Sequence, residues 1–140
     1  SFHVSLLRPF STTIRKELTK LPKVYFHDNG LRNFFLGDFG PLLSRRDTGQ
    51  LLEQLVFRQF LERNDSDDIH FWRTQTQAEV DFVIKNHAYE VKADPTNIRP
   101  RSLERFREHY PQIPLSLVTF RRAFAPDIQS SLPILDIREL

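Results

Sequence analysis

Three acidic side chains and one lysine occupy positions that suit a metal-dependent hydrolase. Glu53 falls inside an apolar helical pattern. Asp81 lies in the run AEVDFVI, and Glu90 and Lys92 lie in the run AYEVKA. Both runs have the length and apolar content of short buried strands. An ionised group is costly in such a strand unless a metal or a charged partner compensates it, so the placement favours a metal site over a solvated surface.

Strand alternation predicts how these charges are arranged. Successive side chains on a strand point to opposite faces. The faces expected for the first strand are Glu79, Asp81 and Val83 on one side and Val80, Phe82 and Ile84 on the other. If the two strands form a hairpin through a tight turn at residues 85–86, Asp81 and Glu90 converge on one face. Two carboxylates and a main-chain carbonyl suit a hard cation such as Mg²⁺, and Lys92 could orient or deprotonate a water.

Glu53 is an independent indication of the same site. At about 100° per residue, it lies between Phe57 and Phe60 on the helix surface, with Val56 nearby. A carboxylate in this apolar stripe should face the core or the sheet. It therefore needs a partner, and a metal-bound water or Lys92 would serve.

The pattern also has a plainer explanation. An acid followed some positions later by Glu-x-Lys occurs by chance in many chains of this size. Glu90 and Lys92 could form an exposed cross-strand ion pair, and Glu53 could be a helix residue at a bend. The strand context of Asp81 and the position of Glu53 on the apolar helix face favour the metal site.

The composition limits the classes of protein that this chain can belong to. Its 140 residues fit one domain, and 39% hydrophobic with 27% charged residues is typical of a soluble globular protein without membrane spans. The absence of cysteine excludes disulfides and thiolate metal sites and fits a cytoplasmic location. The chain contains no methionine, so we expect it to be a piece of a longer protein. The net charge is only +2, so contacts with nucleic acid must come from local clusters.

The elements expected around the site give an α/β (α+β) fold, with a central mixed sheet flanked by helices. The predicted strands are residues 2–7, 24–27, 69–74, 79–85, 87–93, 115–120 and 134–137. The predicted helices are residues 31–36, 50–63, with Thr48 as N-cap, and 100–110. A basic stretch at 11–17 is expected as a hairpin wing or exposed connection, and residues 37–47 as a loop.

Taken together, Glu53, Asp81 and the triplet EVK at 90–92 resemble the PD-(D/E)xK nuclease superfamily. The runs KLPKVYFHDNGL, GQLLE and EVDFVI resemble one branch of it, an uncharacterised C-terminal domain behind predicted AAA-type ATPases of bacteria and archaea. The resemblance implies a restriction-endonuclease-like core in a nuclease-like domain at residues 49–140. It also implies a connector at 1–48, the tail of a winged-helix-like region and a loop, and a missing N-terminal ATPase module.

The same resemblance implies roles for individual residues. Asp81 and Glu90 would bind Mg²⁺ or Mn²⁺, with the Val91 carbonyl as a third ligand. Lys92 would be the catalytic lysine, and Glu53 the acid on the helix. A valine at position 80 replaces the proline that names the motif.

Two groups of basic residues could contact DNA. Arg99 and Arg101 follow the strand that carries Lys92 and could track a phosphate backbone, although Glu104 and Glu108 also fit an ordinary salt-laced helix. A second cluster comprises Arg15, Lys16, Lys20 and Lys23, for which a solvated connector is favoured over a DNA-binding wing. The histidines are scattered, so zinc is not expected.

The first function expected is therefore hydrolysis of DNA phosphodiesters by a metal-dependent nuclease. The alternative is a catalytically inactive nuclease fold that binds DNA or another protein and regulates the ATPase. A purely structural dimerisation or regulatory domain is a third interpretation.

Overall fold

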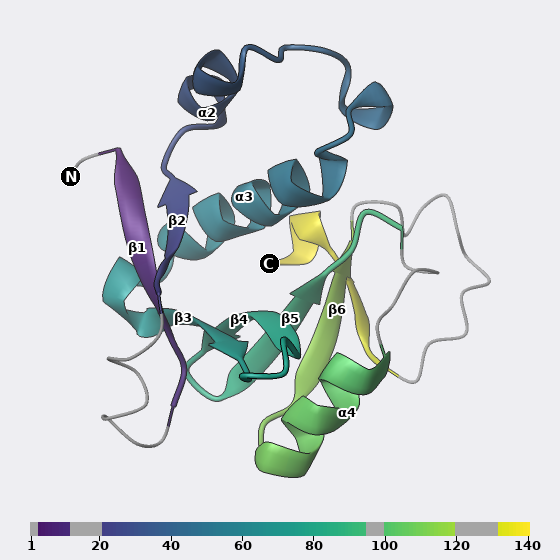
Figure 1. Cartoon of the computed structure of the whole chain (residues 1–140). Helices are drawn as coiled ribbons and strands as arrows, with labels where there is room; N and C mark the ends of the chain where they lie inside the picture. Colours follow the sequence, from purple (N-terminus) through teal and green to yellow (C-terminus); the bar gives the residue numbers. More distant parts are fainter. Residues whose placement is uncertain (1–2, 12–20, 95–99, 120–131) are drawn as a thin grey trace.

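A mixed sheet of seven strands organises the described part of the chain (Figure 1). The computed structural model describes residues 3–11, 21–94, 100–119 and 132–140. The strands are β1 (Val4–Pro9), β2 (Lys23–Phe26), β3 (Ile69–Arg73), β4 (Glu79–Ile84), β5 (His87–Val91), β6 (Leu115–Thr119) and β7 (Ile134–Asp136). Their order in the sheet is β2-β1-β3-β4-β5-β6-β7. The pairs β1–β2, β3–β4 and β4–β5 are antiparallel, and β1–β3, β5–β6 and β6–β7 are parallel.

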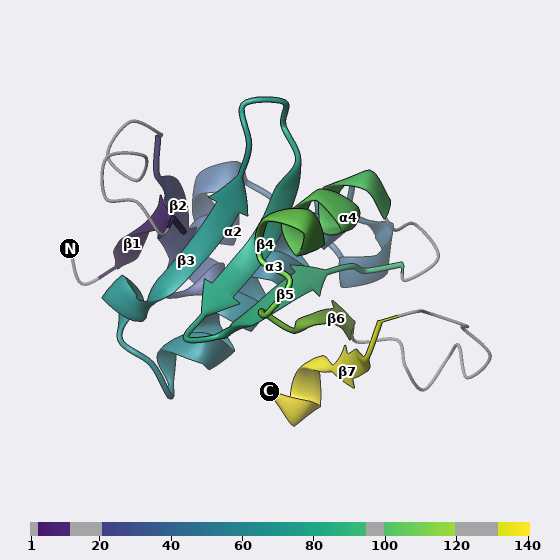
Figure 2. The same ribbon diagram turned by 90° about the horizontal axis from the view of Figure 1, so that it is seen from below.

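Helices cover both faces of this sheet. The described residues contain the helices α2 (Asn29–Leu36), α3 (Thr48–Leu61) and α4 (Pro100–His109), with short 3₁₀ helices at Leu42–Ser44, Ser66–Asp68 and Ile137–Glu139. Seen face-on, α4 lies in front of the sheet and α3 behind it (Figure 2). One buried cluster includes Phe57 of α3 and Phe82 of β4, and a second includes Phe106 of α4 and Val83 of β4. The predicted α/β (α+β) class, with a mixed sheet flanked by helices, is thus confirmed.

The sheet joins segments from both sides of residue 48. The register of β1 against β2 pairs Leu6 with Val24, and β1 continues the sheet by pairing Arg8 with His70 of β3. This parallel contact places β2 at one edge of the sheet, beside Glu53 and Gln54 of α3. The strand that carries Lys23 therefore belongs to the same layer as the strands that carry Asp81 and Glu90.

The start of α3 differs from the prediction. The helix begins at Thr48, whose hydroxyl donates to the carbonyls of Leu42 and Arg45 at 2.6 and 2.7 Å, so Thr48 does not act as the N-cap. Asp47 holds the cap position but makes no side-chain cap bond. Its carboxylate instead accepts from Arg45 and Arg32, each at 2.8 Å, and these guanidinium groups hold the pKa of Asp47 well below its usual range.

A β-bulge in β4 corrects the simple alternation expected for that strand. His70 pairs with Val83 and Trp72 pairs with Val80, so two residues of β4 lie opposite the single residue Phe71. An extra residue of this kind reverses the facing of the side chains beyond it. Val80 consequently packs with Val83 in the α4 cluster, whereas Phe82 packs under α3. The expectation that Val80 and Phe82 share a face is wrong, because the sequence pattern does not reveal the bulge.

Candidate functional site

Asp81 occupies the point where β4 and β5 separate. The ladder between these strands pairs Phe82 with Tyr89, and the next pair in the same register would be Asp81 with Glu90. There the Asp81 side chain replaces a backbone partner: its Oδ2 accepts from the main-chain N–H of Val91 at 2.8 Å. The hairpin register thus sets Asp81 opposite Glu90, and at this point the regular ladder gives way to the contact between the Asp81 side chain and Val91.

Glu90 and Lys92 form an ion pair beneath the surface. The Lys92 Nζ lies 2.7 Å from Glu90 Oε1, and the Glu90 side chain is only 5% exposed. The main-chain N–H of Lys92 donates to the carbonyl of Val118 at 2.9 Å, which fixes the strand at this point. Glu90 Oε2 is buried and has no hydrogen-bond partner among the described residues. The expectation of an exposed cross-strand pair is therefore wrong for Glu90.

Glu53 faces inward from α3, but its partners are not the expected ones. Lys23 of β2 donates to Glu53 Oε1 at 3.1 Å, and the hydroxyl of Tyr25 donates to the same oxygen. Neither Lys92 nor a metal-bound water is needed to compensate this carboxylate. Lys23 and Tyr25 are two residues apart on β2, so alternation places both on the α3 side of the sheet.

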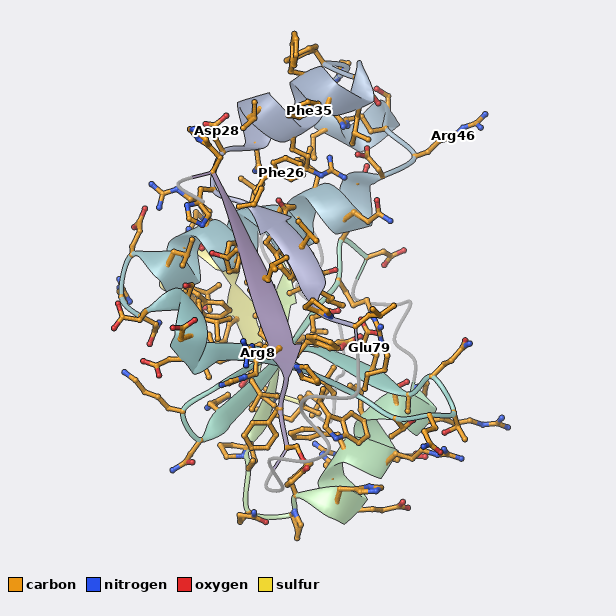
Figure 3. The ribbon with its side chains drawn as sticks, turned by 60° about the vertical axis from the view of Figure 1, so that its left-hand side comes forward. Arg8, Phe26, Asp28, Phe35, Arg46 and Glu79 are labelled. Carbon is orange, nitrogen blue, oxygen red and sulfur yellow. The ribbon has the colours of Figure 1, made fainter. Side chains whose placement is uncertain are left out.

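The Lys23 ammonium lies among three carboxylates. Besides Glu53, it contacts Glu79 Oε1 and lies 3.9 Å from Asp81 Oδ1. The other oxygen of Glu79 accepts from Arg73 at 2.5 Å. Glu79 lies between the layer of α2 and α3 and the layer of α4 (Figure 3). The lysine assigned from the sequence to a solvated basic cluster is in fact 17% exposed and belongs to the site.

Burial and neighbouring charges shift the pKa values of the acids and of Lys23. Burial raises the pKa of Asp81 well above its usual range, and the charges of Glu90 and Glu53 raise it further. Burial also raises the pKa of Glu90, although Lys92 opposes this effect. For Lys23, burial lowers the pKa, but Glu53, Asp81 and Glu79 outweigh it and the net direction is upward. The carboxyls of Asp81 and Glu90 therefore resist ionisation, chiefly because they are buried.

A pocket of about 480 Å³ opens onto these groups. Its lining residues are Arg73, Thr74, Gln75, Gln77, Glu79, Asp81, Glu90, Lys92 and Ser102. Within the described ranges, no group of three or more histidine, aspartate or glutamate side chains is arranged to hold a metal. Asp81 and Glu90 offer two carboxylates, a donor set that would suit Mg²⁺ or Mn²⁺ because such ions keep several waters. The unpartnered Glu90 Oε2 supplies the oxygen that this fit requires.

The basic residues predicted to contact DNA are only partly described. Arg99 lies outside the described residues, as do Arg15, Lys16 and Lys20 of the second cluster. Arg101 is exposed on α4 and lines a second hollow of about 730 Å³, with Arg105 and the turn before β4. This hollow shares Gln77 and Ser102 with the pocket at the acids, so Arg101 lies on a surface continuous with the site.

Sequence reasoning missed four members of the site: Lys23, Tyr25, Arg73 and Glu79. Glu79 was expected on the same face as Asp81 but received no role. Alternation on β2 could have linked Lys23 with Tyr25, because a lysine that shares a face with a buried aromatic residue is rarely fully solvated. Nothing local in the sequence indicates that β2 lies beside Glu53.

The comparisons with known proteins place the chain in a family. Residues 48–135 match the family DUF4143, described as a domain of unknown function. Uncharacterized proteins of Mycobacterium bovis (Mb2031c) and Mycobacterium tuberculosis (Rv2008c) are each 29% identical over 106 residues, or 71% of this chain. The matched part is 24% of each relative, so the chain spans about a quarter of their length. No solved structure matches the chain significantly. In the described part of the chain, no helix is long and apolar enough to cross a membrane.

Proposed function

The chain belongs to the DUF4143 family, and from its site we propose that it is a metal-dependent nuclease-like domain acting on DNA phosphodiesters. The observation that carries the proposal is the unpartnered oxygen of Glu90, buried beside Asp81 and paired on its other side with Lys92. A buried carboxylate oxygen without a donor is costly unless a cation binds it. The resemblance to PD-(D/E)xK nucleases assigns these three residues to metal binding and catalysis.

The roles follow from the contacts of each side chain. Asp81 and Glu90, with the Val91 carbonyl, would hold Mg²⁺ or Mn²⁺. When bound, such an ion would polarise a phosphoryl oxygen and acidify a water. Lys92 is held by Glu90 at the pocket, where its ammonium can position the attacking water or neutralise charge that develops on the phosphate. Glu53 acts indirectly, because the Lys23 ammonium that it binds also lies beside Asp81.

The surface beside the pocket supports a nucleic-acid substrate. Arg101 and Arg105 line the neighbouring hollow, and Arg105 donates to Thr76 in the turn between β3 and β4. Arginines on a surface that leads to a hydrolytic site suit the phosphate backbone of DNA. Arg101 is therefore assigned to phosphate contact, and Arg99 is assigned the same role from the sequence alone.

The larger protein forms part of the proposal. The relatives are about four times longer than the segment that they share with this chain, which leaves room for further domains. The resemblance supplies an AAA-type ATPase module as the linked partner. The absence of cysteine fits a cytoplasmic location for the assembly.

The nuclease function is tested by incubating linear and single-stranded DNA with the purified chain and Mn²⁺. Cleavage should require the metal and should disappear in Lys92→Ala and in Asp81→Asn. Lys85→Ala, a change to an exposed lysine in the turn between β4 and β5, is the matched control and should cleave normally. If the wild type and the Lys92 and Asp81 variants release fragments at the same rate, a contaminant is responsible and the proposal fails.

A non-enzymatic interaction module is the second candidate, and a specific surface favours it. Phe34, Phe35 and Phe39 are each 69% exposed, and Leu36 is 57% exposed. Phe35 lies near Phe26 of β2, with their ring centroids 6.1 Å apart (Figure 3). Exposed aromatic residues gathered on one helix and its following loop are typical of protein contacts. If this function is correct, Phe34→Ser with Phe35→Ser should change the ATPase rate of the longer protein, while Lys92→Ala should not.

A further inference from the structure

The Lys23 side chain is a fixed component of the acid cluster. Its Nζ contacts a carboxylate oxygen of Glu79. It also lies 3.1 Å from Glu53 Oε1 and 3.9 Å from Asp81 Oδ1. The Phe71 ring lies on another side, with its centroid 5.5 Å from the Nζ. Three elements distant in the sequence, β2, α3 and β4, therefore meet at one ammonium group.

The Lys23 ammonium and the Glu90 oxygen mark two different cation positions. The first is filled by the protein itself, among Glu53, Glu79 and Asp81. The second is the buried side of Glu90, where Oε2 has no partner in the described part of the chain. Asp81 faces both positions, because Oδ1 is the atom nearer to Lys23 while Oδ2 accepts from Val91.

The local charges fit a single added divalent ion. When all are ionised, the four carboxylates Glu53, Glu79, Asp81 and Glu90 face the three cations Lys23, Arg73 and Lys92. The cluster then carries one net negative charge, which a single divalent ion reverses. A second divalent ion would have to displace the ammonium or approach it closely, and like charges repel strongly in a partly buried site.

We propose that the Lys23 ammonium takes the place of a second divalent cation, so that this site binds one metal ion and not two. The inference rests on the proposed function, since it places one ion at Asp81 and Glu90. It assigns Lys23 as a positioning residue that holds Glu53, Glu79 and Asp81 in place of a metal. Removal of its charge should open a second cation position among the same three carboxylates.

Isothermal titration calorimetry with Mn²⁺ tests this assignment on the full chain. The wild type should bind one ion, and Glu90→Gln should abolish the binding. Lys23→Met, which keeps the length of the side chain but removes its charge, should bind two ions, and the second should be lost when Glu79→Gln is added. Lys23→Arg should bind one ion. The matched control Lys85→Met, which also removes one positive charge, should bind one ion as well.

Two results would overturn the inference: one ion bound to folded Lys23→Met, or two ions bound to the wild type. The second result is decisive even if Lys23→Met does not fold, which thermal unfolding would reveal. A wild type that binds no ion refutes the metal-dependent function instead. In that case the role of Lys23 still holds if Lys23→Met binds an ion that Glu79→Gln removes, and it fails if that variant also binds none.

Discussion

The carboxylate of Asp81 accepts from the main-chain N–H of Val91, which places a side chain where the ladder between β4 and β5 has ended. This contact connects the two strands at the site without backbone pairing. It also fixes one oxygen of Asp81 and leaves the other directed toward Lys23. The acid is therefore both a structural link and a candidate metal ligand, and substitutions can separate these two roles.

The structural role predicts different stabilities for two variants of Asp81. Asp81→Asn retains an oxygen that can accept from Val91, whereas Asp81→Ala leaves that buried N–H without a partner. We expect Asp81→Ala to have a free energy of unfolding about 1–3 kcal/mol lower than that of Asp81→Asn. Urea denaturation at neutral pH in the presence of a chelator measures the difference. Equal stabilities would show that the bond to Val91 contributes nothing.

The raised pKa of Asp81 predicts how stability varies with pH. A carboxyl with a pKa raised on folding contributes stability that is fully present below its unfolded pKa, about 4, and is lost as the pH rises through the folded value. Asp81→Asn cannot titrate at this position. Without metal, the variant should therefore gain stability relative to the wild type between pH 4 and pH 8. A difference in unfolding free energy that stays constant over this range would contradict the raised pKa.

At high pH, added metal should make the wild type more stable than Asp81→Asn, the reverse of the order expected without metal. If Asp81 and Glu90 hold the metal as proposed, Mn²⁺ would compete with protons for them, so its effect should be larger at pH 8 than at pH 5. At a concentration of 100 times its Kd, the ion should stabilise the wild type by about 2.7 kcal/mol. Asp81→Asn should gain little. Thermal unfolding with and without Mn²⁺ measures both effects, and an equal shift in melting temperature for the two proteins would indicate binding elsewhere.

The ion pair between Glu90 and Lys92 predicts a stability loss that a second substitution repairs. Lys92→Met leaves the buried Glu90 charge without its partner, which we expect to cost about 3 kcal/mol at pH 8. Adding Glu90→Gln removes the unpaired charge and should restore most of that loss. Under the proposed function, cleavage should be absent in both variants, since each lacks the lysine proposed to be catalytic. Denaturant unfolding of the wild type, the two single variants and the double variant gives a double-mutant cycle. If the losses in unfolding free energy of the two single variants add up to that of the double variant, the two residues are not coupled.

The Tyr25 hydroxyl predicts a stabilising contact that persists throughout the neutral pH range. Burial, together with Glu53, raises the pKa of this phenol, so it remains a donor throughout the neutral range. Tyr25→Phe should lower the free energy of unfolding by about 1.5–3 kcal/mol, because the bond goes to a charged acceptor. Tyr110→Phe, at a half-buried ring, is the matched control and should have a smaller effect. Similar losses in both variants would argue against the bond to Glu53.

Local patterns were sufficient for most elements of the fold. Apolar periodicity placed α3 and α4 within two residues of their observed bounds, and the runs around Asp81 and Glu90 are β4 and β5 as expected. The inward direction of Glu53 followed from the angle between helix positions alone. These features depend on neighbours in the sequence, and so composition and spacing carry the information.

The sequence could not reveal which charges meet. The bulge opposite Phe71 depends on how β4 pairs with β3, and no residue of β4 signals it. Lys23 reaches Glu53 only because β1 lies between β2 and β3, which brings β2 to the edge of the sheet beside α3. A lysine from a presumed surface cluster thereby becomes the cation of the acid site. Long-range strand order determines such contacts, because the side chains involved are thirty residues apart in the chain and only a few ångströms apart in space.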